Sequence, residues 1–340
     1  MSALERRQSP VEPGQVVAAA RRGDESAFGA LVESYRPELQ LHCYRMLGSF
    51  EDSEDLVQET FLRAWRKRRT FQGRSTFRAW LYRIATNACL DALRRRPRET
   101  AGHGGDHSLV EIPWLQPYPD RLLEGLAPVE DEPGAEVVDR ETIELAFIAA
   151  VQLLPPRQRA VLIARDVLGW SGAESATLLE VSVAAANSAL QRARATLKRH
   201  LPRRRVEWRS DADATDEERA LLQRYLEAND RGDAAAMIEL LREDALFAMP
   251  PKPEWWMGRE AIVAGWVEGG FGSPSFGDFR SVATRANGQP AAACYLRRPG
   301  EPEYRAFALD VLRVEDGAVT EVIAFDLEPF LDALGLPPTL

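Results

Sequence analysis

The sequence predicts a multidomain protein, with two all-α helical domains followed by an α+β domain at the C-terminal end. Its 340 residues exceed the usual size of a single domain. Helical periodicity dominates to about residue 200 and is interrupted only by a proline- and glycine-rich stretch over 99–138. Segments typical of strands appear after residue 215. We therefore expect domains over 16–98, 139–202 and 215–335.

Apolar residues at helical spacing predict the helices of the first domain. The stretch DESAFGALVESYRPELQLHCYRML (24–47) repeats at this spacing, with a break at Pro37. Ser49 is a suitable N-cap for the next helix, because an acidic first turn follows it. A loop with a glycine is expected over 71–75, and a further helix over 76–95.

The second helical domain is predicted to contain two short helices joined by a tight turn. Ser171 and Glu174 have the spacing of a capping box, which starts the first of these helices. Ser182 caps the second, which becomes basic toward its C-terminal half. This is the plan of a helix-turn-helix.

The third domain combines helices and strands. Two helical segments, DEERALLQRYLEAND and AAAMIELLRED, precede the strands. In RAFALDVLRVEDGAVTEVIAFDL, Asp316-Gly317 is a strong hairpin signal between two alternating runs. We expect a curved antiparallel sheet with helices on one side.

The formal net charge of −9 conceals a strong segregation of charge. Residues 60–98 hold twelve basic residues and one acid, and residues 191–209 hold eight basic residues and one acid. Residues 99–139 hold ten acids and one base, while residues 215–340 hold 12 basic and 22 acidic residues. Two basic modules are thus joined by an acidic linker and followed by an acidic domain.

The first basic module has the composition of a nucleic-acid surface. Arginines on one helix face are ordinarily a solvated surface, but here aromatic residues lie among them and in the adjoining loop. Arginines neutralise phosphates, and aromatic rings stack on unpaired bases. Phe71 lies outside the apolar period and is the best candidate for such a base. Phe77 and Trp80 can also be explained as core.

Other classes of function have little support in the sequence. No run of about 18 apolar residues occurs, and the first residues lack the apolar core of a signal peptide. The three cysteines have no CxxC spacing, so we expect buried free thiols in a reducing cytoplasm. His103 and His107 in a glycine-rich loop are weak evidence for a metal, so no metal or cofactor is expected.

Four motifs resemble those of extracytoplasmic-function sigma factors, the two-domain group that recruits bacterial RNA polymerase to promoters. They are DSEDLVQETFLRAW (52–65), FRAWLYRIATNACLDALRRR (77–96), LPPRQRAVLIARDVLGWS (154–171) and SALQRARATLK (188–198). The resemblance implies sigma domain 2 in the first helical domain and sigma domain 4 in the second. It implies an alternative sigma factor that initiates transcription and is not an enzyme.

The resemblance also implies site residues in the first helical domain. The largest-subunit clamp helices of the core polymerase would contact Asp52, Asp55, Leu56, Gln58, Glu59 and Phe61. The −10 promoter element, with one flipped base, would be bound by Phe71, Gln72, Arg74, Ser75, Trp80, Arg83 and Asn87.

In the second helical domain the resemblance implies −35 binding and a contact with the flap of the second-largest polymerase subunit. The implied −35 residues are Ser182, Ala185, Asn187, Ser188, Gln191, Arg192, Arg194 and Lys198. The helix departs from the family where a Thr-Val-Lys-Ser-Arg-like run is usual, because Ala185 to Ala189 supply no base. The turn also carries Glu180 where glycine is common. Both departures leave the −35 specificity open.

The acidic linker has two interpretations. It is either a solvating tether or, as the resemblance implies, a strand that follows the polymerase active-site cleft toward the RNA exit. Trp114 and Tyr118 would then hold its path.

The third domain resembles the SnoaL-like, cone-shaped fold related to nuclear-transport-factor-type and ketosteroid-isomerase-type domains. Sigma factors with this fusion form a subgroup that resembles the present chain and is regulated in cis, although the sequence leaves open whether the domain activates or inhibits. The domain is a structural contact, a ligand-binding module for a small-molecule effector, or a catalyst using Asp310, Asp326 or Tyr295. Residues that could line an apolar pocket are Trp255, Trp256, Trp266, Tyr295 and Phe307.

One alternative function uses the same domains differently. The front half would be a DNA-binding regulator of the repressor kind, fused to a small-molecule-binding or isomerase-like enzyme domain. Neither function involves a membrane.

Overall fold

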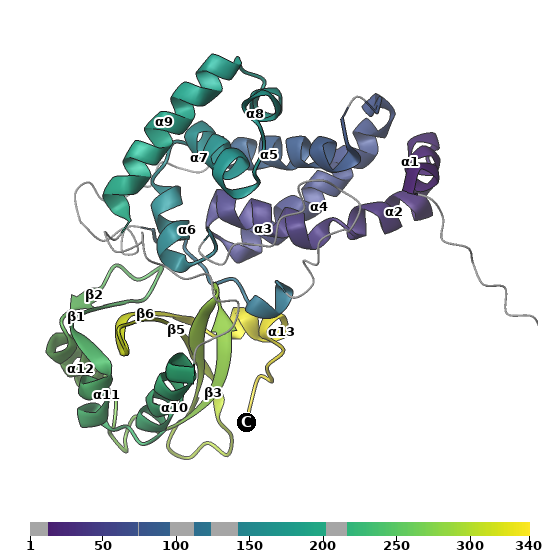
Figure 1. The fold of residues 1–340 in the computed structure, drawn as a ribbon. Helices are drawn as coiled ribbons and strands as arrows, with labels where there is room; N and C mark the ends of the chain where they lie inside the picture. The colour runs from purple at the N-terminus through teal and green to yellow at the C-terminus, as the bar shows by residue number, and fades with distance from the viewer. Residues whose placement is uncertain (1–12, 74, 96–111, 124–141, 202–215) are drawn as a thin grey trace, which may run out of the picture.

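The computed structural model describes residues 13–73, 75–95, 112–123, 142–201 and 216–340. The first helical domain begins with two short helices and continues with three longer ones that form its core (Figure 1). Its elements are α1 (Pro13–Arg22), α2 (Glu25–Glu33), α3 (Arg36–Leu47), α4 (Phe50–Lys67), η1 (Arg68–Thr70) and α5 (Phe77–Arg95).

Local signals in the sequence explain where these helices start. Ser49 caps α4 as predicted, since its hydroxyl accepts a hydrogen bond from the amide of Asp52 at 3.2 Å. The predicted break at Pro37 is displaced. The chain interrupts the helix at Ser34 and Tyr35, and Pro37 lies in the first turn of α3, where the missing N–H has no cost.

The second helical domain contains the predicted helix-turn-helix. Its elements are α6 (Leu145–Gln152), α7 (Pro156–Leu162), the π-helical turn η4 (Ile163–Val167), α8 (Gly172–Leu179) and α9 (Val183–His200). The capping box of Ser171 and Glu174 is present, and Ser182 accepts from the amide of Ala185 at 3.2 Å. Both predicted caps are confirmed.

The C-terminal domain is the predicted α+β unit. Its elements are α10 (Asp216–Asp230), α11 (Ala234–Leu240), β1 (Leu241–Ala248), β2 (Trp255–Met257), α12 (Arg259–Glu268), β3 (Asp278–Ala286), β4 (Gln289–Arg297), β5 (Arg305–Glu315), β6 (Ala318–Asp326), η6 (Glu328–Phe330) and α13 (Leu331–Leu334). The turn at Asp316-Gly317 has positive φ at both residues, as a two-residue hairpin requires.

The sheet is mixed, so the expectation of a purely antiparallel sheet is wrong. Its strand order is β2-β1-β6-β5-β4-β3, and β1 runs parallel to β6 while the other neighbours are antiparallel. Parallel neighbours need a long crossover, and here β2 to β5 and α12 separate the two strands in the chain.

The two faces of this sheet have different partners. One face packs on α10, α11 and α12 through the core of the domain itself (Figure 1). The other face joins a hydrophobic cluster that extends into both helical domains and includes Tyr118. The sheet of the C-terminal domain therefore shares one continuous hydrophobic core with the two helical domains that precede it in the chain.

Candidate nucleic-acid interface

The outer face of α4 carries the residues expected to contact polymerase. Asp55 and Gln58 are exposed, while Asp52 and Glu59 are half-buried. Glu59 accepts from Arg63 at 2.6 Å, so part of its charge is neutralised within the helix. Spacing of three to four residues places the exposed side chains on one stripe.

The two apolar residues assigned to this contact face the other way. Leu56 and Phe61 are 8% and 9% exposed and belong to the hydrophobic core, so in this structure they are not available to pack against polymerase as expected. Leu62 is 58% exposed and lies one turn beyond Gln58. An apolar residue type favours the core, but the position of Leu62 in the helical period places it on the outer face of α4.

Phe71 is buried, contrary to the expectation that it stands outside the core. It is 7% exposed, and its ring lies 5.5 Å from the rings of both Phe77 and Trp80. Trp80 is itself 3% exposed. The chain enters this loop through η1, which turns the ring inward after the α4 period has ended.

The remaining −10 candidates are more accessible. Gln72 and Ser75 are exposed, Arg83 and Asn87 are half-buried, and Arg74 lies outside the described residues. Arg83 and Asn87 are one turn apart on α5, so they share a face with Trp80. The structure thus brings the polar candidates of α5 together beside the loop.

The recognition helix α9 presents all its candidates to solvent. Each of Ser182, Ala185, Asn187, Ser188, Gln191, Arg192, Arg194 and Lys198 is exposed. Arg194 is held by Asp166 of η4, with its Nη2 and Nε at 2.6 and 2.9 Å from the carboxylate oxygens. This bidentate pair fixes the guanidinium at the edge of the helix.

A cavity separates the −10 face from the helix-turn-helix. Its volume is about 300 Å³, and both helical domains line it. The lining residues are Arg63, Lys67, Thr70, Trp80, Arg83, Ile84, Asn87 and Glu180. Glu180 has φ +54°, a left-handed conformation that costs a residue with a Cβ about 1–2 kcal/mol. An acidic residue of the second helical domain therefore lines the same cavity as the basic residues Arg63, Lys67 and Arg83.

Buried polar contacts also join the two helical domains. Arg45 is 4% exposed and donates to the Thr142 hydroxyl at 2.6 Å. Arg159 is 3% exposed and donates to the carbonyl of Met46. The rings of Tyr82 and Trp170 meet at 5.5 Å. In this structure the two domains form one packed unit.

The described part of the linker, residues 112–123, is packed inside the molecule and is not a solvated tether. Ile112, Leu115 and Tyr118 are at most 2% exposed. The linker also follows the start of α4, because the Gln116 amide oxygen accepts from the Ser49 hydroxyl at 2.9 Å and from the Glu51 amide at 3.1 Å.

The turn between β3 and β4 connects this linker to both helical domains. Asn287 is fully buried, and its side chain makes three hydrogen bonds to three segments. Its Oδ1 accepts from the Tyr118 amide at 2.7 Å, and its Nδ2 donates to Tyr44 Oη at 2.8 Å and to the Ile143 carbonyl at 2.7 Å. Asn287-Gly288 has positive φ at both positions, as a tight hairpin turn requires.

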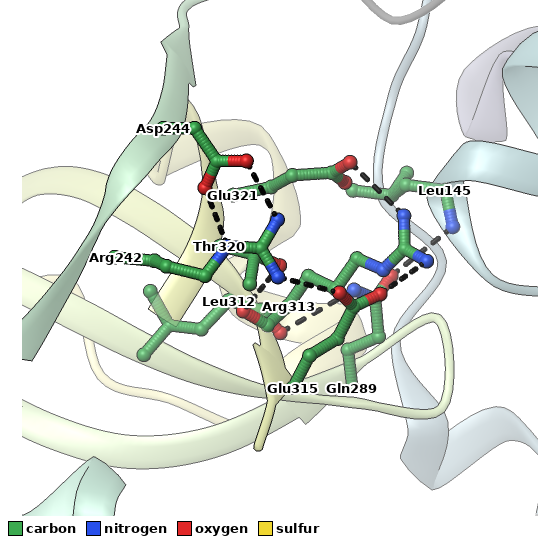
Figure 2. Close-up of polar contacts among 9 residues, drawn as sticks. All are labelled: Leu145, Arg242, Asp244, Gln289, Leu312, Arg313, Glu315, Thr320 and Glu321. Atoms are coloured by element: carbon green, nitrogen blue, oxygen red, sulfur yellow. Dashed lines mark hydrogen bonds and ion pairs between the residues drawn. The ribbon is translucent and has the colours of Figure 1, made fainter. Parts of the chain in front are cut away.

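Charged and polar groups extend this contact on both sides of the turn. Asp120 of the linker pairs with Arg285 at 3.2 Å and accepts from the Gly288 amide at 2.8 Å. Gln289 accepts from the amide of Leu145, the first residue of α6, at 3.1 Å (Figure 2). Figure 2 also shows a network behind this contact, in which Arg313 pairs with Glu315 and Glu321 at 2.7 and 3.0 Å.

The five residues suggested for an apolar pocket do not lie together. Tyr295 is fully buried on the face toward the helical domains, where its hydroxyl donates to the Pro337 carbonyl at 2.7 Å. Trp256 and Trp266 both contact Phe247 on the opposite face. Trp255 and Phe307 are 44% and 39% exposed. Tyr295 and the two tryptophans thus lie on opposite faces of the sheet. The face that each residue takes depends on the register between strands, which the sequence of one strand alone does not give.

Three further observations concern the cysteines, metal binding and membrane-spanning helices. The cysteines Cys43, Cys89 and Cys294 are buried free thiols, as expected. Within the described ranges, no group of three or more His, Cys, Asp or Glu side chains could hold a metal ion, and His103 and His107 lie outside those ranges. The described helices include none with the length and apolar character needed to cross a membrane.

Comparisons with known proteins agree with this geometry. The models for Sigma-70 region 2, Sigma-70 region 4 and the SnoaL-like domain match residues 31–99, 144–197 and 222–322. The chain is 43% identical to the ECF RNA polymerase sigma factor SigG of Mycobacterium tuberculosis, over 96% of this chain and 88% of the relative. It is 28% identical to SigW of Bacillus subtilis over 53% of this chain and 92% of that protein.

A solved structure shows the same fold over nearly the whole chain. The crystal structure of the extracytoplasmic function sigma factor SigJ of Mycobacterium tuberculosis is similar with a TM-score of 0.58 at 22% identity. The alignment covers 91% of this chain and 99% of SigJ. The two helical domains, the SnoaL-like domain and the identity to SigG together show that the chain belongs to the ECF RNA polymerase sigma factors, with a SnoaL-like domain fused at its C-terminal end.

Proposed function

We propose that the structure is a resting state of this sigma factor, in which the SnoaL-like domain holds both sigma domains and the linker together and so inhibits promoter opening. The observation that carries the proposal is the Asn287 side chain. It bonds to the first sigma domain, the linker and the second sigma domain at once. The neighbouring contacts of Asp120 with Arg285 and of Gln289 with Leu145 join the same segments, but each links the turn to only one of them.

Two features of the resting state conflict with the roles that the family resemblance implies. Trp80, Arg83 and Asn87 of α5 line a cavity whose other side is lined by Glu180 of the second sigma domain. The linker residues that would follow the polymerase cleft are buried between α4 and the C-terminal sheet. Transcription therefore requires the sigma domains to separate and residues 112–123 to leave the core.

The buried linker carries a cost that favours its release. Among the described residues, the Tyr118 hydroxyl has no hydrogen-bond partner although the side chain is fully buried. An unsatisfied buried hydroxyl costs about 1–3 kcal/mol. Binding of the linker elsewhere, where this hydroxyl meets water or a polar group, would recover that free energy.

The partners of the released state are core polymerase and promoter DNA. We assign the polymerase contact to the outer stripe of α4, with Asp55, Gln58 and Leu62 as its exposed members. The −10 contact uses the exposed loop residues with Arg83 and Asn87, and the −35 contact uses α9. We further propose that the chain acts by binding alone and catalyses no chemical step.

A substitution at Leu62 tests the polymerase surface. Leu62→Asp should weaken binding to core polymerase at least tenfold, because a charge replaces the exposed apolar side chain of the stripe. Val183→Asp is the matched control, since Val183 is a 45% exposed apolar residue on α9. Affinity is measured by titration of labelled protein with purified core enzyme. Equal binding of both variants would remove α4 from the interface.

A second substitution tests the resting state. Asn287→Gly tolerates the left-handed backbone but removes three hydrogen bonds, which weakens the closed arrangement by about 2–3 kcal/mol. We expect run-off transcription from a duplex promoter to rise several-fold, and proteolytic cleavage near residue 118 to become faster.

The control for this experiment is Asp316→Gly, the same kind of change in the exposed turn of the other hairpin. It should leave transcription unchanged. Circular dichroism establishes that each variant is folded. Lower or unchanged transcription in a folded Asn287→Gly protein would mean that the domain assists the sigma modules or leaves them unaffected. Absence of run-off RNA from the parent protein would instead favour a repressor-like regulator.

A further inference from the structure

The concave face of the C-terminal sheet contains a carboxyl group in an unusual environment. Asp310 of β5 points toward α10, where Tyr225 Oη donates to its Oδ2 at 3.0 Å. The Cys294 thiol donates to the same oxygen at 3.6 Å. Loss of hydration raises the pKa of Asp310 to about 6, and no basic residue among the described ones opposes this effect. The carboxylate therefore lacks the cation that usually compensates a buried charge.

Asp310 is less enclosed than its neighbours. Tyr225, Cys294 and Asn229 are 1%, 2% and 6% exposed, whereas Asp310 is half-buried. Both hydrogen bonds use Oδ2, so Oδ1 is the oxygen that these two partners leave for a ligand.

A second carboxylate lies on the same face. Ala308 is opposite Asp326 in the β5–β6 ladder, and Asp310 is opposite Ala324. Residues opposite each other share a face, so the side chains of Asp310 and Asp326 are diagonal neighbours about 7–8 Å apart at Cα. Asp326 is exposed, so it is more accessible to a ligand from solvent than Asp310.

Aromatic rings lie near the two carboxylates. Phe276, Phe279 and Phe307 contact one another, with ring centroids 5.8 to 6.0 Å apart. Phe279 lies two residues before Ser281, on the same face of β3, and the Ser281 hydroxyl is 3.9 Å from the Cys294 thiol beside Asp310. The β-bulge between Cys294 and Tyr295 takes Phe307, which is 39% exposed, out of the regular alternation of β5, and its ring contacts Phe279. The rings therefore lie on the same side of the sheet as the carboxylates.

We propose that this surface binds an organic cation, an amine or quaternary ammonium with an apolar body, between the carboxylates of Asp310 and Asp326 and the rings of Phe279 and Phe307. Phe276 is not part of the site, because the guanidinium of Arg298 already lies over its ring at 5.7 Å from the centroid. The positive group compensates the carboxylates, and it is also attracted to the faces of the rings. The apolar body covers the exposed ring of Phe307. The site is on the side of the sheet opposite to the linker, so the proposal does not depend on the resting-state proposal.

Matched pairs of small molecules test the charge requirement. The full-length protein is titrated calorimetrically with phenethylamine, naphthylmethylamine and benzyltrimethylammonium, and with the neutral phenethyl alcohol and naphthalenemethanol. We expect the cations to bind saturably and the alcohols to bind about tenfold more weakly, or not measurably. Equal affinity of an amine and its alcohol would overturn the proposal, as would the absence of saturable binding by all three cations.

Variants locate the site. Asp310→Asn keeps the shape of the side chain and should reduce affinity for the cations about tenfold. Phe307→Ala removes an exposed ring, so it should fold normally and bind severalfold more weakly. Glu254→Gln, at an exposed position of the same domain, should bind like the parent. Unchanged affinity in folded Asp310→Asn or Phe307→Ala would place the binding elsewhere and overturn the assignment.

Discussion

The two helices that we propose to bind the promoter, α5 and α9, differ in accessibility. Every −35 candidate on α9 is exposed, whereas Trp80 on α5 is buried and Arg83 and Asn87 line a cavity that Glu180 also lines. Under the resting-state proposal, promoter melting is blocked while most of the −35 surface remains accessible. A sigma factor in this state could meet duplex DNA before it can hold a single strand.

The largest expected effect comes from Phe71, whose ring supports α5. Phe71→Ala should destabilise the first sigma domain by about 3 kcal/mol, because the ring is buried against Phe77 and Trp80. Urea unfolding measures this loss. Phe71→Leu keeps most of the volume and should cost less than half as much.

The pair of variants at Phe71 also separates packing from base contact. If Phe71→Leu is stable but fails to melt duplex promoters while working on pre-melted ones, the ring contacts a base in the open complex. A stability of Phe71→Ala equal to the parent would contradict the packing described above.

The second effect is a dependence on pH that should act on α5 more than on α9. His42 lies beneath α5, with its Nε2 2.9 Å from the Thr86 hydroxyl. Burial, followed by the charges of Arg45 and Arg78, lowers its pKa to about 3. In the unfolded chain the pKa is near 6.5, so the unfolded state binds the proton first. Stability is then complete above about pH 6.5 and falls as the pH decreases toward 3.

By pH 5 this proton alone should cost about 2 kcal/mol, since each pH unit is worth about 1.4 kcal/mol. Unfolding in urea at pH 7 and pH 5 measures the loss, and His42→Gln should reduce it. Binding of single-stranded −10 DNA should weaken at pH 5 more than binding of −35 duplex. An identical pH response in the parent and His42→Gln would show that other groups are responsible.

The smallest effect comes from Glu180, which lines the cavity from the second helical domain. Glu180→Gly removes the carboxylate and relieves the left-handed backbone, a gain of about 1 kcal/mol for the helix-turn-helix. Binding of single-stranded −10 DNA to the free protein should improve severalfold, while −35 duplex binding stays unchanged. Glu180→Asn, neutral and tolerant of this backbone, should give the same binding result. Improvement with glycine but not with asparagine would exclude an electrostatic role.

Local chemistry explains which features could be predicted from the sequence. The caps at Ser49, Ser171 and Ser182 and the turn at Asp316-Gly317 depend on a few adjacent residues, and all were predicted. Asn287-Gly288 is an equally strong signal for a two-residue hairpin turn, although it is not among the predicted features. That signal could have found the turn, although it could not have identified the turn's partners.

Features that depend on distant partners were not predictable. Phe71 was expected outside the core because it breaks the helical period, but a loop residue can still fold back onto the next helix. Tyr295 and the tryptophans were grouped by type, and only the strand register separates them. The buried linker was the largest omission, since its proline-rich composition is typical of exposed segments and its partners lie more than sixty residues away at Ser49 and Asn287.

The Asn287 turn has a consequence for how this factor responds to its own abundance. An inhibitory contact within one chain has an equilibrium that does not depend on protein concentration. Producing more of the chain therefore does not titrate the inhibitor away. If polymerase binds only the released form, its apparent Kd equals the intrinsic Kd divided by the fraction released. A released fraction of about 1% would weaken recruitment about a hundredfold at every dose. The rate of transcription from its promoters would then depend on the concentration of free polymerase and on the signal that acts on the turn. Increased synthesis of the factor would raise that rate only in proportion to the amount of factor.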